Sequence, residues 1–220
     1  MFSTDAAKNI ALGGSAADPV HLGHLGMLRA IVDLRRFDKI LWVLNGASLE
    51  KPSLAPSNLR LRMAVQAFDE AGLLGSAPSV ELVLDEMSSV GLTALRRYRQ
   101  IRREYPAARE IRLYLGADAV VPQERYNGRC EIAARWSEGE RLIQDAQFLI
   151  IPRQGYPDPR LLDLPQNFEV FDPVPPVPEA SSRVIRACIA NGMPWEHWVP
   201  ECVARVIKTH KLYGWKGGAS

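Results

Sequence analysis

Residues 13–24 read Gly-Gly-Ser-Ala-Ala-Asp-Pro-Val-His-Leu-Gly-His, and this stretch decides the fold. A short apolar run, residues 8–14, leads into the two glycines, and apolar residues then recur at helical spacing over residues 22–37. A buried strand that turns on glycine into a helix presents free N–H groups and the positive end of the helix dipole, which suit a phosphate. Residues 39–44 are again apolar and strand-like, so the stretch predicts a strand, helix, strand unit.

The same alternation continues along the chain. We expect further helices at 59–74, 92–105 and 139–145, and further strands at 80–84, 111–115 and 148–151. Apolar strands that alternate with helices predict an α/β, Rossmann-like fold, a parallel sheet with helices on both faces. Ligands of such sheets bind beyond the carboxyl ends of the strands.

Prolines are concentrated in the last third of the chain. Eight of the sixteen prolines lie between Pro152 and Pro178, which predicts a long irregular connection containing a short strand at 168–171. Two helices, at 182–191 and 199–212, are expected to close the chain. Since no linker or internal repeat interrupts the pattern, we expect residues 1–220 to form a single domain.

Composition excludes several classes of protein. The 220 residues include 27 basic and 25 acidic side chains, and a net charge of +2 predicts neither a nucleic-acid partner nor a membrane surface. No apolar run approaches the about 20 residues that span a bilayer. Cys130, Cys188 and Cys202 are too widely spaced to predict a disulfide framework or a zinc cluster, so we expect a cytoplasmic protein.

His21 and His24 are the first candidate functional residues. Their spacing can place both imidazoles on one side of the first helical turn, facing a phosphate, with Gly23 leaving room between them. Alternatively, each ring only satisfies a capping or core hydrogen bond. A metal site is a third hypothesis, but the nearest additional ligand is Asp18, so no protein metal site is predicted. The glycines match neither a dinucleotide fingerprint nor a P-loop.

Ser181, Ser182 and Arg186 form a second candidate anion site. Either serine can cap the helix that follows, and Arg186 lies one turn further on, where its planar guanidinium can reach the same phosphate. The alternative is an ordinary N-cap followed by surface arginines.

Together these motifs resemble the signatures of the nucleotidyltransferase superfamily, and within it those of the nicotinate or nicotinamide mononucleotide adenylyltransferases. The first motif resembles the family's glycine turn and His-x-Gly-His, and residues 180–186 resemble its Ile-Ser-Ser-Thr-x-x-Arg, with Ala180 and Arg183 replacing the isoleucine and the threonine. Ser15, Ala16 and Ala17 also depart from the usual Gly-Thr/Ser-Phe.

The resemblance implies roles for further residues. It assigns the catalytic phosphate contacts to His21, His24, Lys51 and Arg186. It assigns other ATP contacts to Gly14, Ser15, Gly116, Asp118, Ser181 and Ser182, with the helices of residues 181–214 completing the ATP site. It assigns the pyridine mononucleotide to Thr93, Trp136 and Arg153. The closing Leu212-Tyr213-Gly214 resembles the family's Leu-Tyr, which we interpret as a packing feature.

The implied activity is transfer of AMP from ATP to nicotinate mononucleotide, with Mg²⁺ bridging the phosphates and no covalent intermediate. Leu92, where the family commonly has an aromatic residue, and the insert at 122–131 depart from the pattern around the pyridine pocket. Nicotinamide mononucleotide and phosphopantetheine remain alternative acceptors, and a catalytically silent nucleotide-binding module is an alternative of another class. His197 and His210 receive no role, and a homo-oligomer is left open.

Overall fold

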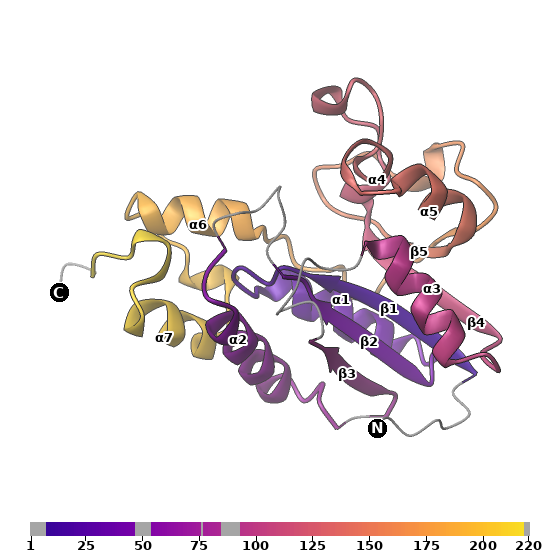
Figure 1. Cartoon of the computed structure of the whole chain (residues 1–220). Coiled ribbons are helices and arrows are strands. Elements are labelled where there is room, and N and C mark those ends of the chain that lie inside the picture. The colour runs from indigo at the N-terminus through magenta and orange to yellow at the C-terminus, as the bar shows by residue number, and fades with distance from the viewer. Residues whose placement is uncertain (1–7, 47–53, 76, 85–92, 218–220) are drawn as a thin grey trace.

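The protein is built on a six-stranded parallel sheet in the order β3-β2-β1-β4-β5-β6 (Figure 1). The computed structural model describes residues 8–46, 54–75, 77–84 and 93–217. Its strands are β1 (Asn9–Ser15), β2 (Lys39–Leu44), β3 (Ser79–Val83), β4 (Glu110–Gly116), β5 (Gln147–Ile151) and β6 (Phe168–Val170). The strand order turns at β1 and β4, which lie side by side in the middle of the sheet. The predicted α/β Rossmann-like fold is confirmed.

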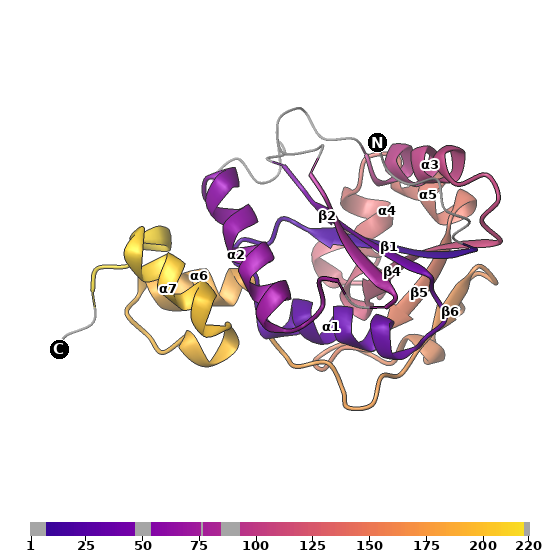
Figure 2. The same ribbon diagram turned by 90° about the horizontal axis from the view of Figure 1, so that it is seen from below.

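Helices cover both faces of the sheet. They are α1 (Leu22–Asp33), α2 (Ser57–Glu70), α3 (Ala94–Glu104), α4 (Glu131–Arg135), α5 (Gly139–Asp145), α6 (Ser182–Ala190) and α7 (Glu201–Thr209). One core cluster joins the sheet to α1, α2, α6 and α7, and a second joins its other face to α3, α4 and α5 (Figure 2). Within the four described ranges, no helix is both long enough and apolar enough to cross a membrane.

The glycines after β1's apolar residues are required by close packing between strands. A Cβ atom on Gly13 would lie 2.2 Å from Cζ of Tyr114, whose ring crosses β1 from the neighbouring strand β4. A Cβ atom on Gly14 would lie 2.2 Å from the carbonyl oxygen of Val43 on β2. Neither neighbour is free to move, because both belong to the buried sheet. The glycines therefore let β1 run in close contact with both neighbours up to its carboxyl end.

The predicted elements all occur; β2 and α5 have the predicted ends, and others have shifted ends. The helix expected at 22–37 ends at Asp33, because Arg35 adopts a left-handed φ of 51° that a helix cannot continue through. The helix expected at 199–212 begins only at Glu201, after Pro200, and ends at Thr209. The insert at 122–131 contains a 3₁₀ turn (Glu124–Tyr126) and runs into α4, a helix that the sequence pattern did not predict.

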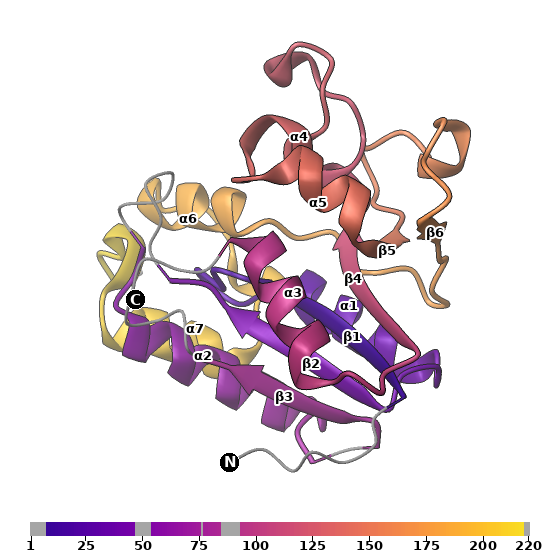
Figure 3. The ribbon, with the colours of Figure 1, turned by 45° about the vertical axis from the view of Figure 1, so that its right-hand side comes forward.

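The carboxyl ends of the central strands lie between two groups of helices. In Figure 3, α6 and α7 flank these ends on one side and α4 and α5 on the other. The loops after β1, β4 and β5 and the start of α6 meet at this edge, as the hydrogen bonds described below establish. This is the edge at which an open parallel sheet binds ligands.

Candidate active site

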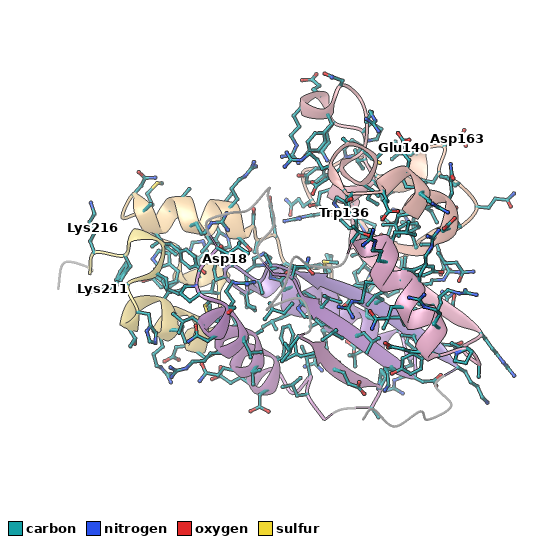
Figure 4. The ribbon with its side chains drawn as sticks, viewed as in Figure 1. Asp18, Trp136, Glu140, Asp163, Lys211 and Lys216 are labelled. Carbon is teal, nitrogen blue, oxygen red and sulfur yellow. The ribbon has the colours of Figure 1, made fainter. Side chains whose placement is uncertain are left out.

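The loop between β1 and α1 is a tight turn that buries a carboxylate. Oγ of Ser15 accepts a hydrogen bond from the Ala17 N–H at 3.0 Å, and Ala17 itself adopts a left-handed φ of 48°. The next peptide bond, Asp18–Pro19, is cis. Asp18 is only 2% exposed, and in Figure 4 it lies where the β1–α1 loop meets α2 and the C-terminal segment. The loop therefore packs an acidic side chain inward beside the start of α1.

His21 and His24 cap the N-terminus of α1 reciprocally. Nδ1 of His21 accepts from the His24 N–H, and Nδ1 of His24 accepts from the His21 N–H, each at 3.3 Å. The two imidazoles stack with centroids 3.7 Å apart, and His24 also packs edge-on against Trp42 at 5.5 Å. The structure therefore places both rings on the same side of the first turn, as their spacing predicted.

This capping determines which ring nitrogen carries the proton. An Nδ1 that accepts a hydrogen bond is unprotonated, so a neutral ring carries its proton on Nε2 and can donate from there. Burial, and then the nearby Arg153 guanidinium, lower the pKa of His21 from 6.5 to about 3. His21 is therefore a neutral Nε2–H donor at neutral pH. The capping hypothesis and the phosphate hypothesis are compatible, because the cap occupies only Nδ1.

The second motif docks directly onto the first. Oγ of Ser182 donates to the Pro19 carbonyl at 3.0 Å, and Nη1 of Arg186 donates to the Asp18 carbonyl at 2.5 Å. The expectation that a serine hydroxyl caps α6 is wrong for Ser181, the N-cap residue, whose side chain makes no capping bond. The Ser182 hydroxyl instead forms a hydrogen bond that joins the two motifs. The N-termini of α1 and α6 thus lie together.

Arg153 ties the end of β4 to the start of α6. Its Nη1 donates to Oδ2 of Asp118 at 2.8 Å, and its Nη2 donates to the Ala180 carbonyl at 2.7 Å. Asp118 follows Gly116, where a Cβ atom would lie 2.5 Å from Oδ1 of Asp118. Since the Arg153 charge also acts on His21, this brace belongs to the same site.

Thr93 and Trp136 lie near each other on the other side of the sheet edge. Oγ1 of Thr93 caps α3 by accepting from the Arg96 N–H at 3.2 Å and donates to Oε2 of Glu138 at 3.1 Å. Trp136 directly follows α4, is half-buried, and lines an open surface depression of about 560 Å³ together with Arg129 and Glu138. Figure 4 shows Trp136 on the α4 and α5 side and Asp18 on the α2 and α6 side.

Of four further residues named from the sequence, the structure describes two. Lys51, the predicted phosphate ligand, is outside the described residues, as is Leu92. His197 packs on Trp198 with centroids 4.1 Å apart, and His210 ends α7; both are exposed. Neither histidine approaches the first motif in any contact of the described chain.

Sequence reasoning missed two residues that hold the first loop. Arg60 on α2, 2% exposed, donates to the carbonyls of Ala16 at 2.6 Å, Asn45 at 2.7 Å and Ala55 at 3.0 Å. Oη of Tyr213 donates to Oδ1 of Asp18 at 2.8 Å. A signal for Arg60 existed, because it occupies an apolar position of its helix, in line with the buried residues that follow at helical spacing. The sequence marks Tyr213 only through the closing Leu-Tyr, interpreted as a packing feature, and gives no sign of its contact with Asp18.

The site holds cationic groups and N–H donors rather than a metal cage. Among the described residues, no group of three or more His, Cys, Asp or Glu side chains is placed to bind a metal ion. Arg186 and the stacked histidines converge at two helix N-termini, a donor set that suits a polyphosphate.

Comparison with known proteins points to one family. No protein-family model matches the chain. A probable nicotinate-nucleotide adenylyltransferase of Thermus thermophilus is 31% identical over 214 residues, covering 93% of this chain and 98% of the relative. A protein of the same name from Gloeobacter violaceus is 29% identical over 218 residues, covering 96% and 99%.

Solved structures share the fold. The nicotinic acid mononucleotide adenylyltransferase of Plasmodium falciparum, complexed with NaAD, superposes with a TM-score of 0.74 at 20% identity, covering 95% of this chain and 98% of that one. The same enzyme complexed with APC gives a TM-score of 0.72 at 19% identity.

Proposed function

The chain belongs to the nicotinate-nucleotide adenylyltransferase family, a family of nucleotidyltransferases, and we propose that it transfers AMP from ATP to nicotinate mononucleotide. In this reaction a phosphate oxygen of the mononucleotide attacks the α-phosphorus of ATP. The bond from that phosphorus to the bridging oxygen of the β-phosphate breaks, and pyrophosphate leaves. The products are nicotinate adenine dinucleotide and pyrophosphate.

One observation carries this proposal, namely the docking of the two motifs. The Arg186 guanidinium reaches the Asp18 carbonyl at 2.5 Å, which brings the helix starts at His21 and Ser182 beside one another. Two helix N-termini and a guanidinium in one place suit several phosphates of one nucleotide better than a single anion.

The histidines supply the stabilisation that the reaction needs. The attacking phosphate is already an anion, so the enzyme must position the reactants and stabilise the charge that develops on the transferring group. His21 and His24 are fixed by the reciprocal cap, which leaves Nε2 of the neutral His21 ring as a donor. A neutral donor fixed in this way stabilises developing charge without rearranging during the reaction.

We propose that Mg²⁺ enters with ATP and would supply positive charge that offsets the charge of the phosphates. The donor set supports this, since its cationic groups and N–H donors would contact the phosphate oxygens that the ion leaves free. Lys51 is a further proposed phosphate ligand from the loop after β2.

We propose that the remaining contacts divide along the sheet edge. The ATP side is lined by Gly14, Ser15, Gly116, Asp118, Ser181 and Ser182. Residues 181–214 complete this ATP site, and the whole chain forms a single domain. Thr93, Trp136 and Arg153 face the mononucleotide. The hydrogen bond from Thr93 to Glu138 supports a shared pyridine region. The three free cysteine thiols support a reducing, cytoplasmic location.

The decisive experiment measures product formation with ATP, Mg²⁺ and one acceptor at a time. The acceptors are nicotinate mononucleotide, nicotinamide mononucleotide and phosphopantetheine, and dinucleotide and pyrophosphate are quantified together. We expect the highest kcat/KM with nicotinate mononucleotide. A higher value with another acceptor would reassign the substrate, and nucleotide binding without pyrophosphate release from any acceptor would favour the silent module.

A further inference from the structure

The C-terminal turn reaches the nucleotide site through one side chain. Residues 211–214 follow α7, and Lys211 and Tyr213 adopt left-handed φ angles of 50° and 57°. Such angles are uncommon for residues other than glycine and carry a cost in free energy, so the surrounding contacts must hold the backbone there. In Figure 4 the turn runs between Lys211 and Lys216 at the outer side of α6 and α7.

This left-handed backbone places the Tyr213 hydroxyl within hydrogen-bond distance of Asp18. Oη of Tyr213 donates to Oδ1 of Asp18 at 2.8 Å, and the Ala55 N–H donates to the same oxygen at 3.1 Å. Burial, and then the adjacent Asp18 carboxylate, raise the pKa of Tyr213, so the hydroxyl keeps its proton and remains a donor. The carboxylate is thereby held by its Oδ1 atom.

Asp18 in turn contacts Arg186. Its carbonyl accepts from Nη1 of Arg186 at 2.5 Å, whereas its Oδ2 lies 3.7 Å from the same nitrogen. Oδ2 is buried and has no hydrogen-bond partner among the described residues. If Oδ1 lost its Tyr213 donor, the carboxylate could rotate and bring an oxygen onto the guanidinium. A close ion pair there would compete with a phosphate for Arg186.

We infer that Tyr213 is a positioning residue, which acts through Asp18 to keep Arg186 available to the nucleotide phosphates. This inference rests on the proposed function, because it takes the phosphates as the ligand of Arg186. Tyr213 therefore has a role beyond the packing feature that the sequence predicted. It makes the C-terminal turn part of the nucleotide site although the turn itself need not touch the nucleotide.

The test compares the wild type with Tyr213→Phe, Arg186→Gln and the double variant. Calorimetry measures the Kd of α,β-methylene-ATP with Mg²⁺, and kinetics measure kcat and both KM values. We expect Tyr213→Phe to weaken analogue binding about tenfold, as the loss of a charge-assisted hydrogen bond can, while the KM for nicotinate mononucleotide stays unchanged. Because Tyr213 acts through Arg186, the double variant should bind as weakly as Arg186→Gln alone.

Tyr105→Phe is the matched control. Its hydroxyl also hydrogen-bonds a charged group, accepting from Nζ of Lys39 at 3.2 Å, but it lies just after α3, away from both motifs. This control should bind the analogue as the wild type does. Wild-type affinity in Tyr213→Phe, or a loss that adds fully to that of Arg186→Gln, would overturn the inference.

The melting temperature of each variant separates positioning from folding. If Tyr213→Phe melts too low to assay, Tyr213→Phe is combined with Asp18→Asn, which removes the carboxylate that would compete for Arg186 and keeps the backbone carbonyl that Arg186 contacts. The inference predicts that Asp18→Asn alone and the combined variant bind the analogue as the wild type does, and a tenfold weaker Kd in either folded variant would overturn it. Wild-type protein that binds the analogue but releases no pyrophosphate contradicts the proposed function alone, and the Kd comparison still decides the role of Tyr213.

Discussion

The buried, neutral state of His21 makes the protein's stability depend on pH. The ring is 6% exposed, and burial together with the Arg153 charge lowers its pKa from 6.5 to about 3. Below pH 6.5 the unfolded chain binds a proton on this ring that the folded protein does not bind. The contribution of His21 to stability is therefore complete above that pH and is lost progressively as the pH falls toward about 3.

The loss of unfolding free energy on acidification can be calculated from the protonation of His21 in the unfolded chain. At about pH 5.5 a histidine of ordinary pKa is about nine-tenths protonated, whereas the buried ring is neutral, so the unfolded state gains about 1.4 kcal/mol relative to about pH 8. His21→Asn provides the comparison, because asparagine is a good N-cap residue whose side-chain oxygen can accept the His24 N–H without titrating. The buried amide changes stability equally at both pH values.

The assay is urea unfolding of both proteins at the two pH values. We expect the wild type to lose about 1.4 kcal/mol more unfolding free energy than His21→Asn on acidification. His24, His197 and His210 are present in both proteins, so the comparison isolates the replacement of His21. If acidification lowers the unfolding free energy of the two proteins equally, His21 is not held neutral by the fold. The argument that its ring donates from Nε2 throughout the working pH range would then fail as well.

Three further outcomes are expected. His24→Ala should lower kcat by about 10²-fold in a protein that still folds, although loss of the His24 half of the α1 cap lowers its melting temperature, and near-normal turnover would remove His24 from the mechanism. Arg60→Met should lower the unfolding free energy in urea by about 3–5 kcal/mol, because it removes a buried guanidinium that donates to three carbonyls and lies in the field of Asp18, whereas Arg62→Met on the exposed side of the same helix should cost under about 0.5 kcal/mol. Trp136→Ala should raise the KM for nicotinate mononucleotide about tenfold and leave the Kd of the ATP analogue unchanged; weakening of both would place Trp136 in a structural role.

The fold was predictable because its elements obey simple periodicities. β2 is buried at all six positions, as its unbroken apolar run implies, and α5 has the ends that the pattern gives. Backbone geometry was less accessible. The left-handed φ at Arg35 ends α1 early, and α4 is only five residues long, too short for a helical period to stand out.

The site was predictable where chemistry is concentrated in local motifs. His21 with His24, and Ser182 with Arg186, lie within single turns, so their spacing predicts that each pair shares a helix start. Long-range contacts leave no such trace. Tyr213 meets Asp18 across 195 positions of the sequence, and only the three-dimensional arrangement of the chain reveals that contact.

The two arginines of the site differ in what they can still bind. A guanidinium offers five N–H donors in a planar fork. Both terminal nitrogens of Arg153 already donate hydrogen bonds, Nη1 to the Asp118 carboxylate and Nη2 to the Ala180 carbonyl. Its charge is balanced by the Asp118 carboxylate, whose Oδ2 lies 2.8 Å from Nη1. Among the hydrogen bonds of the described residues, Arg186 donates only from Nη1, to the Asp18 carbonyl. The carboxylate oxygen that faces it, Oδ2 of Asp18, lies 3.7 Å from the same nitrogen. An incoming phosphate therefore meets at Arg186 only a long ion pair with Asp18, whereas Arg153 would have to release a hydrogen-bonded Asp118 first. This difference favours Arg186 as the phosphate ligand and Arg153 as a brace, whose charge adds to the effect of burial in lowering the pKa of His21.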